Sequence, residues 1–213
     1  MKYLFLDIDG VLNSQQGYMR KECKSVQTSI PFDHNPEAFH YYEKFQLDSK
    51  FLIKKLIKEF DLQVVISSTW RKTGIDYINE VWRNEMEEYR HIEFTPSSDS
   101  VKIYNGIMIE SFESDGLNCN RISHHSTPRG LEIEHYLRCK KFANVNYSRE
   151  RQLEIQKESG IENYLILDDD SDFLFNQRKH FVKVNHEYGF TVEDYHKAYS
   201  ILVKDVASLN YDS

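Results

Sequence analysis

Two aspartates separated by one residue, Asp7 and Asp9, directly follow a short apolar run near the start of the chain. A carboxylate at such a position can act as a nucleophile or a metal ligand, and a second carboxylate nearby can give or accept a proton. The same Asp-x-Asp-Gly pattern also occurs in ordinary turns after a strand, so this pair alone leaves both a catalytic site and a plain turn open.

Four further aspartates are crowded into five positions after another apolar run. These are Asp168, Asp169, Asp170 and Asp172. A charge run is usually a solvated loop, but carboxylates held close to Asp7 and Asp9 repel one another unless a cation neutralises them. Because ligation by oxygen alone favours a hard ion, the two clusters together predict a Mg²⁺ site and leave several choices of ligand open.

A third group, Ser67, Ser68 and Thr69, again comes directly after an apolar run. Hydroxyls and backbone N–H groups at a strand end can bind a phosphate oxygen, although such a cluster can equally cap a helix. Arg71 and Arg129 can add positive charge. Arg129 is expected in the first turn of a helix, where the helix dipole disfavours a cation, and this unfavourable position points to a functional reason.

The elements that must position these groups are strands separated by helices. Apolar runs rich in strand formers predict strands over residues 3–6, 63–67, 163–167 and 181–184. Helical spacing and capping signals predict helices from an N-cap at Asp48, over 75–89, from Thr127 and Pro128 to about 138, over 149–159 with a stop at Gly160, and from a capping box of Thr191 and Asp194. This alternation predicts an α/β fold with a mainly parallel sheet covered on both faces. Ligands in such folds bind at the carboxyl ends of the strands, where all three groups fall.

A single domain is expected over residues 1–213, because this length suits one domain and can bury a real core. Residues 13–47 carry no sustained hydrophobic period and are expected to form an irregular flap. Residues 91–126 are expected to form a polar insertion with short strand-like pieces at 101–104 and 106–109.

Composition and charge exclude several classes of protein. The aromatic content of 14% excludes a disordered chain, and no apolar run approaches the roughly 20 residues that span a bilayer. Asp7 interrupts the opening apolar run, so no signal peptide is expected. A net charge of -7 argues against wrapping of extended nucleic acid, though not against binding a short phosphorylated end. Three widely spaced cysteines form no disulfide framework, which fits a cytoplasmic protein.

The motifs together resemble a known family. Residues 7–12, with the sequence DIDGVL, resemble the first signature of the haloacid dehalogenase (HAD) superfamily, DxDG(V/T)L. Residues 66–68 (ISS), Arg129 with Gly130, and residues 167–169 (LDD) with Asp172 resemble the second, third and fourth signatures, in the same order and strand contexts. The resemblance implies a Rossmann-like three-layer HAD fold with a small flap or cap insertion.

A narrower resemblance rests on three longer segments. Residues 68–71 (STWR), 129–133 (RGLEI) and 165–170 (LILDDD) resemble HAD phosphatase domains of phage proteins and of RNA-repair proteins that process polynucleotide ends. The two resemblances together cover about 170 residues, from the first signature to the fourth.

The resemblance implies roles for the acidic residues. Asp7 would be the nucleophile that forms an aspartyl-phosphate, and Asp9 would be the general acid/base, with its backbone carbonyl also facing Mg²⁺. Asp168 or Asp169 would complete the metal site together with Asp7.

The resemblance also implies a phosphate-binding group. Ser67 or Ser68 would hold the transferring phosphoryl group, with Arg129 as the cationic partner. The third-signature cation is normally a lysine, so Lys141 or Lys157 could serve in place of Arg129.

The function implied by the resemblance is that of a Mg²⁺-dependent phosphomonoesterase acting on a nucleotide or on the terminal phosphate of a nucleic acid. The acidic net charge favours the small substrate, whereas the narrower resemblance favours the nucleic-acid end. A phosphatase of a non-nucleotide metabolite and an inactive HAD-fold binding module remain alternatives, and the intact pair of Asp7 and Asp9 argues against the inactive module. Asp9 also disfavours a dehalogenase, since dehalogenases usually lack the second aspartate. The oligomeric state is left open.

Overall fold

The computed structural model of this protein describes residues 2–23, 25–32, 35–72, 75–89, 91–95, 101–104, 107–110, 128–142 and 163–209. These residues fall into two compact units. The first draws on Met1–Phe94, Asn163–Ser171 and Lys179–Ser213, and the second on Thr95–Glu162 and Asp172–Arg178. The expected single domain over 1–213 stays a prediction.

The first unit is built on a five-stranded sheet in which every neighbouring pair is parallel. Its strands are β1 (Lys2–Leu6), β4 (Leu62–Ile66), β5 (Ile92–Phe94), β8 (Tyr164–Asp168) and β9 (Phe181–Lys183), in the spatial order β5-β4-β1-β8-β9. This confirms the α/β fold, the parallel sheet and all four predicted strands. The fifth strand, β5, was not predicted. It has three residues, which are too few to show a hydrophobic period in the sequence.

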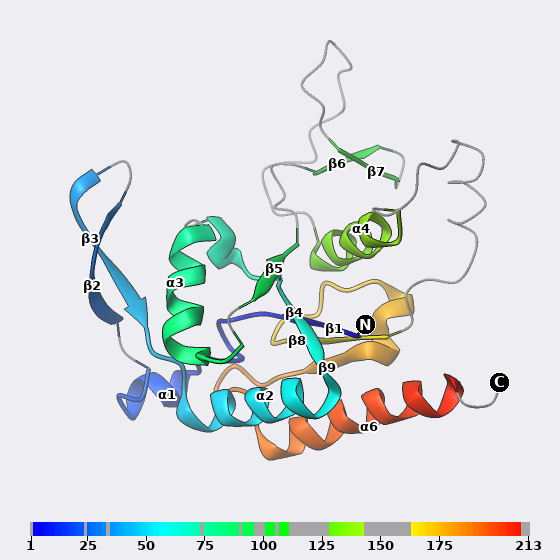
Figure 1. Ribbon diagram of the computed structural model, residues 1–213. Helices are drawn as coiled ribbons and strands as arrows, with labels where there is room; N and C mark the ends of the chain where they lie inside the picture. Colours follow the sequence, from blue (N-terminus) through cyan, green and yellow to red (C-terminus); the bar gives the residue numbers. More distant parts are fainter. Residues whose placement is uncertain are drawn as a thin grey trace, which may run out of the picture. The chain divides into compact units, whose positions relative to one another are not determined.

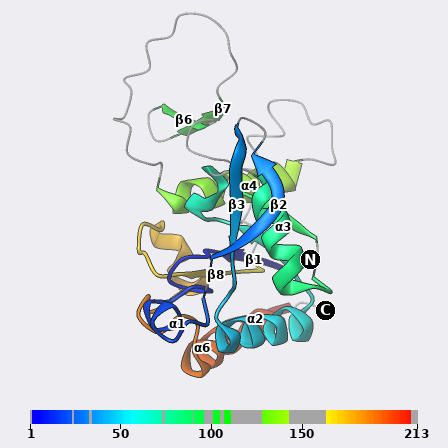
Figure 2. The same ribbon diagram turned by 90° about the vertical axis from the view of Figure 1, so that its left-hand side faces the viewer.

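Two helices of this unit cover one face of the sheet. The helices α2 (Leu47–Phe60) and α6 (Val192–Leu209) lie side by side, with α2 against β4 and α6 against β8 and β9 (Figures 1 and 2). The helix α3 (Ile75–Met86) packs beside α2. The sheet and this helical face provide two of the three predicted layers, and the third layer stays a prediction.

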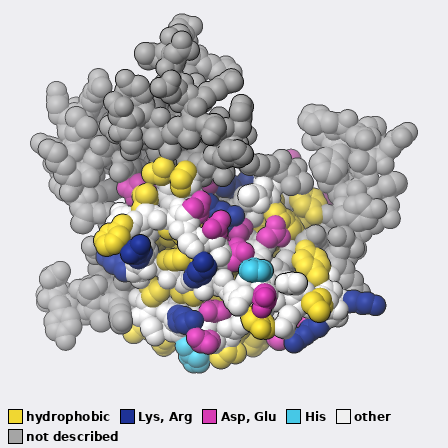
Figure 3. Space-filling view, turned by 180° about the vertical axis from the view of Figure 1, so that it is seen from behind, with side chains coloured by type: hydrophobic (Ala, Val, Ile, Leu, Met, Phe, Trp, Pro, Cys, Tyr) yellow, Lys and Arg dark blue, Asp and Glu magenta, His cyan; other side chains and the backbone are white. Residues whose placement is uncertain are grey.

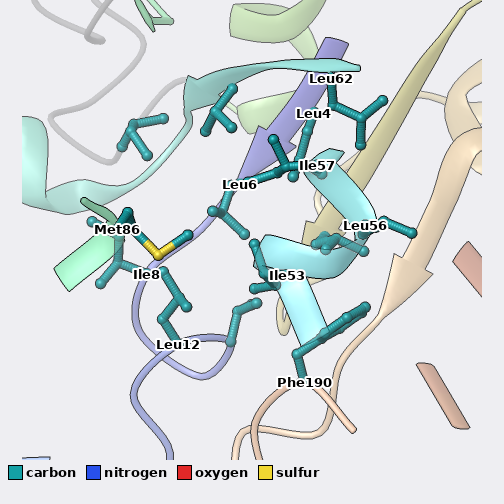
Figure 4. Close-up of a cluster of buried hydrophobic side chains, with 14 of the residues drawn as sticks. Leu4, Leu6, Ile8, Leu12, Ile53, Leu56, Ile57, Leu62, Met86 and Phe190 are labelled. Carbon is teal, nitrogen blue, oxygen red and sulfur yellow. The ribbon is translucent and has the colours of Figure 1, made fainter. Parts of the chain in front are cut away.

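Aliphatic side chains of the sheet and α2 form the core on this face (Figure 4). Its members include Leu4, Leu6, Ile8, Leu12, Ile53, Leu56, Ile57, Leu62, Met86 and Phe190. Full burial of such a side chain contributes about 1.5–3 kcal/mol to folding. Two members, Ile8 and Leu12, come from the loop after β1 rather than from a strand or helix. The core therefore anchors the loop that carries the first acidic pair.

The helix boundaries match the predictions in part. The capping box of α6 is confirmed, because Thr191 N–H donates to Asp194 Oδ2 (3.2 Å) and Asp194 N–H donates to Thr191 Oγ1 (3.4 Å). The predicted N-cap of α2 at Asp48 is wrong: Gln46 takes that place, and Asp48 lies in the first turn. Gln46 is held there by long-range contacts, since its N–H donates to the carbonyl of Leu12 and its side-chain amide to the carbonyl of Tyr188.

The second unit contains the helix α4 (Arg129–Phe142), which follows Pro128 as predicted and continues past residue 138. Thr127 and the helix predicted over 149–159 lie outside the described residues. The short pieces expected in the polar insertion are present as β6 (Val101–Tyr104) and β7 (Ile107–Glu110), which pair antiparallel.

The segment 13–47, expected to be an irregular flap, contains regular structure. It comprises the short helix α1 (Gln15–Met19) and an antiparallel hairpin of β2 (Ser25–Phe32) and β3 (Asn35–Glu43). The register of this hairpin shifts on both sides of Pro31, which has no N–H to donate to a ladder. The shifts break the alternation of period two that would have revealed the strands. No helix among the described residues is both long and apolar enough to cross a membrane.

Candidate functional site

Two of the predicted groups lie at the carboxyl ends of adjacent strands. Leu6, the last residue of β1, pairs with Ile66 of β4 on one side and with Leu167 of β8 on the other. The next residues continue the ladder: Asp7 N–H donates to the carbonyl of Leu167 (3.0 Å), and Ser67 N–H donates to the carbonyl of Leu6 (2.9 Å). Strand register therefore brings the first acidic pair and the hydroxyl cluster to one edge of the sheet.

Three carboxylates meet at this edge. Asp7, Asp168 and Asp169 each offer one oxygen, and these oxygens all lie within 4.8 Å of one another. Asp7 and Asp168 are 2% and 1% exposed. Among the described residues this group excludes Asp170, which is exposed, and Asp172. Of the acidic run, Asp168 and Asp169 are thus the residues that lie with Asp7 in this group, and their role as metal ligands stays a prediction.

The donor set of this group fits a hard divalent ion. Ligand oxygens around Mg²⁺ lie about 2.1 Å from the ion, so two ligands of one ion are separated by at most about 4.2 Å, a distance within the 4.8 Å limit that holds for the three carboxylate oxygens. A positive charge among these carboxylates would relieve their mutual repulsion. Asp9 contributes no side chain to the group, and its expected contact through the backbone carbonyl stays a prediction.

The loop after β1 is a tight turn closed around one carbonyl. The carbonyl of Ile8 accepts from the N–H groups of Leu12 (2.8 Å), Asn13 (3.1 Å) and Val11 (3.3 Å). Gly10 N–H donates to the carbonyl of Asn13 (2.7 Å), and Gly10 has a φ of 71°, in the left-handed region. This region favours glycine, because a Cβ there costs about 1–2 kcal/mol.

Gly10 also makes room for a carboxylate of the acidic group, that of Asp169. A Cβ added at Gly10 would lie 2.4 Å from Cγ of Asp169, which is closer than any real contact allows. The glycine of the first signature therefore lets the side chain of Asp169 pack directly on the loop that follows Asp7.

Gly10→Ala is expected to weaken binding of a divalent cation by about 10- to 100-fold, because the added methyl displaces the carboxylate of Asp169. Titration calorimetry with Mg²⁺ or Mn²⁺ measures this. Gly189→Ala is the matched control, since Gly189 also has a positive φ (76°) and a close neighbour, Ser49 Oγ, at 2.8 Å. Both variants should lose stability, and equal ion affinities in the two would contradict the prediction.

Two residues of the hydroxyl cluster, Ser67 and Ser68, are buried, whereas Thr69 is exposed and begins the 3₁₀ turn η1 (Thr69–Lys72). Ser67 and Ser68 are 2% and 0% exposed. Ser68 Oγ accepts from the N–H of Trp70 (3.4 Å), and the carbonyl of Ser68 accepts from Nε of Arg71 (2.7 Å). Ser68 thus supports η1, and Arg71 is tied to this end of β4.

Asp9 lies apart from the buried carboxylates and is exposed. Its Oδ2 accepts a hydrogen bond from the indole Nε1 of Trp70 at 2.8 Å. No sequence pattern pointed to this contact, because the two residues are 61 positions apart. Only the parallel pairing of β1 with β4 brings them to the same edge.

In the second unit, Arg129 is the first residue of α4 and is partly buried. Its N–H donates to Oδ2 of Asp172 (2.9 Å), and the N–H of Gly130 donates to the carbonyl of Asp172 (3.2 Å). Asp172, which is distant in sequence, therefore accepts hydrogen bonds from the first two N–H groups of α4 and caps its amino-terminal end. Its negative charge at this end also offsets the unfavourable position of Arg129 in the helix dipole.

Gly130 is needed where α4 meets the segment after the acidic run. A Cβ there would lie 2.6 Å from the backbone N of Leu174. Gln177 bridges the two segments, since its Nε2 donates to the carbonyl of Gly130 (2.9 Å) and its Oε1 accepts from Leu174 N–H (3.0 Å). The Arg-Gly pair of the third signature thus combines a cation with a close backbone contact.

The two lysines considered in place of Arg129 differ from it in position. Lys141 lies twelve residues further along α4, which corresponds to about 18 Å of helix length. Its backbone therefore lies near the opposite end of the helix from that of Arg129. Lys157 lies outside the described residues.

Comparison with known proteins agrees with the resemblance seen in the motifs. The family model for the HAD domain in Swiss Army Knife RNA repair proteins matches residues 3–195. Searches of curated proteins and of solved structures found no significant match. The matched range contains every signature segment and both groups of acidic residues. The chain belongs to the family of HAD domains found in Swiss Army Knife RNA repair proteins.

Proposed function

We propose that this protein is a Mg²⁺-dependent phosphomonoesterase that works through an aspartyl-phosphate on Asp7. The observation that carries the proposal is the group formed by Asp7, Asp168 and Asp169, whose carboxylate oxygens lie within 4.8 Å of one another at the carboxyl end of the sheet. Membership in a HAD family supports the same reaction class.

Asp7 is suited to be the nucleophile because its orientation is fixed. Its backbone continues the sheet, and its Oδ1 accepts from the N–H of Ile8 at 2.8 Å. In the proposed first step a carboxylate oxygen of Asp7 attacks phosphorus, the bond from phosphorus to the ester oxygen breaks, and Asp9 gives its proton to the departing oxygen. In the second step Asp9 takes a proton from the water that attacks the aspartyl-phosphate, which releases inorganic phosphate and restores Asp7.

The remaining residues balance the charge of the transferring group. Mg²⁺, when bound by the aspartates, would neutralise the carboxylates and the phosphoryl oxygens. The hydroxyl of Ser67 or of Ser68 would hold a phosphoryl oxygen, and Arg129 would supply a cation. Phosphoryl transfer depends mostly on such positioning and charge neutralisation, so few further groups are required.

The proposed substrate is the terminal phosphate of a nucleic acid. The family description, which refers to RNA repair, supports this choice. On the face seen in Figure 3, Asp and Glu side chains lie among Lys and Arg side chains. Together with the net charge of -7, this mixed surface suits recognition of one phosphorylated end better than wrapping of a long strand. Because the negative net charge of the chain favours a small substrate over a nucleic acid, a mononucleotide is the second candidate substrate.

A panel of phosphate esters tests the proposal. The full chain with Mg²⁺ is given 3′- and 5′-phosphorylated RNA oligonucleotides, the matching DNA oligonucleotides and mononucleotides, and release of inorganic phosphate is measured. We expect faster release, as kcat/KM, from an oligonucleotide end than from a mononucleotide. The opposite order would change the substrate to a nucleotide, and no release from any member would refute the phosphatase function.

A further inference from the structure

A tryptophan is bound directly to the proposed general acid/base. The indole Nε1 of Trp70 donates to Oδ2 of Asp9 at 2.8 Å. Asp9 is exposed. The proposed nucleophile Asp7, in contrast, donates its N–H to the carbonyl of Leu167 and accepts from the N–H of Ile8 through Oδ1. An exposed carboxylate without a fixed partner turns among several rotamers, so a hydrogen bond from a fixed donor decides where its oxygens point.

The indole itself is held in place from several sides. The backbone N–H of Trp70 donates to Oγ of Ser68, which is fully buried just after β4. The ring of Trp70 lies against the ring of Tyr77, with centroids 5.9 Å apart and an angle of 35° between the planes. Both rings also pack, partly buried, against the hydrophobic core. The direction of the indole N–H is therefore set by the fold and not by Asp9.

We propose that Trp70 is a positioning residue for Asp9, an inference that rests on the proposed function. The indole N–H is a donor only and cannot take a proton from the carboxyl group. Because Oδ2 accepts this bond, Oδ1 is the oxygen that the bond leaves open for proton exchange. Trp70 thus fixes both the rotamer of Asp9 and the oxygen that exchanges protons with the leaving group and with water.

The consequence is selective for the leaving group. An alkoxide needs a proton as it departs, whereas p-nitrophenolate leaves well without one. Loss of the indole N–H should therefore lower kcat/KM for an alkyl phosphate by about 10-fold, a fraction of the 10²–10⁴-fold that general acid catalysis provides. The loss of kcat/KM for p-nitrophenyl phosphate should stay below about 3-fold. This parameter is the one to compare, because it covers only the steps up to departure of the leaving group, whereas the attack of water in the second step is common to both esters and enters kcat.

Trp70→Phe is the variant of choice, because it keeps an aromatic ring against Tyr77 and removes the N–H. Trp82→Phe is the matched control: Trp82 is fully buried, and its indole donates to the carbonyl of Tyr89, away from the acidic residues. Both variants lose one indole hydrogen bond. Their melting temperatures separate general destabilisation from an effect on Asp9.

A double-mutant cycle adds a second readout. In an Asp9→Asn background the Trp70→Phe change should have almost no further effect on the alkyl phosphate, because the group that Trp70 positions is no longer an acid. Trp70→His, which keeps a ring N–H, should recover part of the kcat/KM lost on the alkyl phosphate.

The outcomes separate this inference from the proposed function. Selective loss on the alkyl phosphate in Trp70→Phe, absent in Trp82→Phe, supports the positioning role. Equal loss of kcat/KM on both esters, failure of Trp70→Phe to fold, or additivity with Asp9→Asn would assign Trp70 a structural role and overturn the inference. Wild-type protein that turns over neither ester would refute the proposed function itself, whereas active wild type with an unaffected Trp70→Phe refutes the positioning role alone.

Discussion

Asp7→Asn is expected to abolish phosphate release, with turnover falling by a factor of about 10⁴ or more. The amide has nearly the size of the carboxylate, and its oxygen can still accept from the N–H of Ile8, so the local geometry is kept. An amide oxygen attacks phosphorus poorly, so no aspartyl-phosphate should form. The loss of one charge from three crowded carboxylates should leave the melting temperature without metal equal or higher.

The matched control for this variant is Asp170→Asn. Asp170 lies in the same acidic run and undergoes the same chemical change, but it is exposed and lies outside the group of three carboxylates. Its turnover should stay close to that of the wild type. Trapping of the phosphoenzyme with p-nitrophenyl phosphate, followed by mapping of the labelled residue, identifies the nucleophile. Undiminished turnover in Asp7→Asn, or a label on a serine, histidine or cysteine, would leave only the fold in common with phosphatases.

The sheet was predictable from sequence because its strands are buried. The runs that became β1, β4 and β8 are continuous apolar segments, as expected for parallel strands covered by other elements. Polar residues directly after each run then mark the carboxyl edge, so the general location of the candidate site followed from the same pattern.

The residue pattern alone did not predict which carboxylates of the acidic run lie beside Asp7, whereas the family resemblance named Asp168 or Asp169. Neighbouring residues after a strand point in different directions, and no local signal says which of them turns toward Asp7. The structure resolves this through long-range contacts: Asp169 packs on Gly10, and Asp172 caps the helix that begins at Arg129. Both contacts join segments more than 40 residues apart.

The same limit explains the two errors in the expected elements. Gln46 is an unfavourable N-cap by type, and only its contacts with Leu12 and Tyr188 place it at the start of α2. The hairpin of β2 and β3 was hidden because the register shifts beside Pro31 interrupt its alternation. In each case a tertiary contact or an irregular pairing overrides the local pattern.

Removal of divalent cations is expected to abolish activity as completely as the loss of Asp7. Asp7, Asp168 and Asp169 bring three negative charges together at a place where a phosphate must also bind, and without a cation these charges repel the substrate. Treatment with EDTA should therefore stop phosphate release, and added Mg²⁺ should restore it. Ca²⁺ should not restore it, because Ca²⁺ favours more ligands at longer distances than this compact group provides.

A thermal measurement makes this prediction independent of turnover. Binding of an ion to the folded state alone raises the melting temperature, so Mg²⁺ should stabilise the wild type by RT ln(1 + c/Kd), where c is the Mg²⁺ concentration, and this stabilisation grows with the logarithm of c above Kd. Asp169→Asn removes one of the three carboxylates and should lose most of this stabilisation, whereas Asp170→Asn should keep it. Full activity after exhaustive chelation, or equal stabilisation of both variants by Mg²⁺, would show that the three carboxylates do not form the metal site and that the burial of Asp7 and Asp168 needs another explanation.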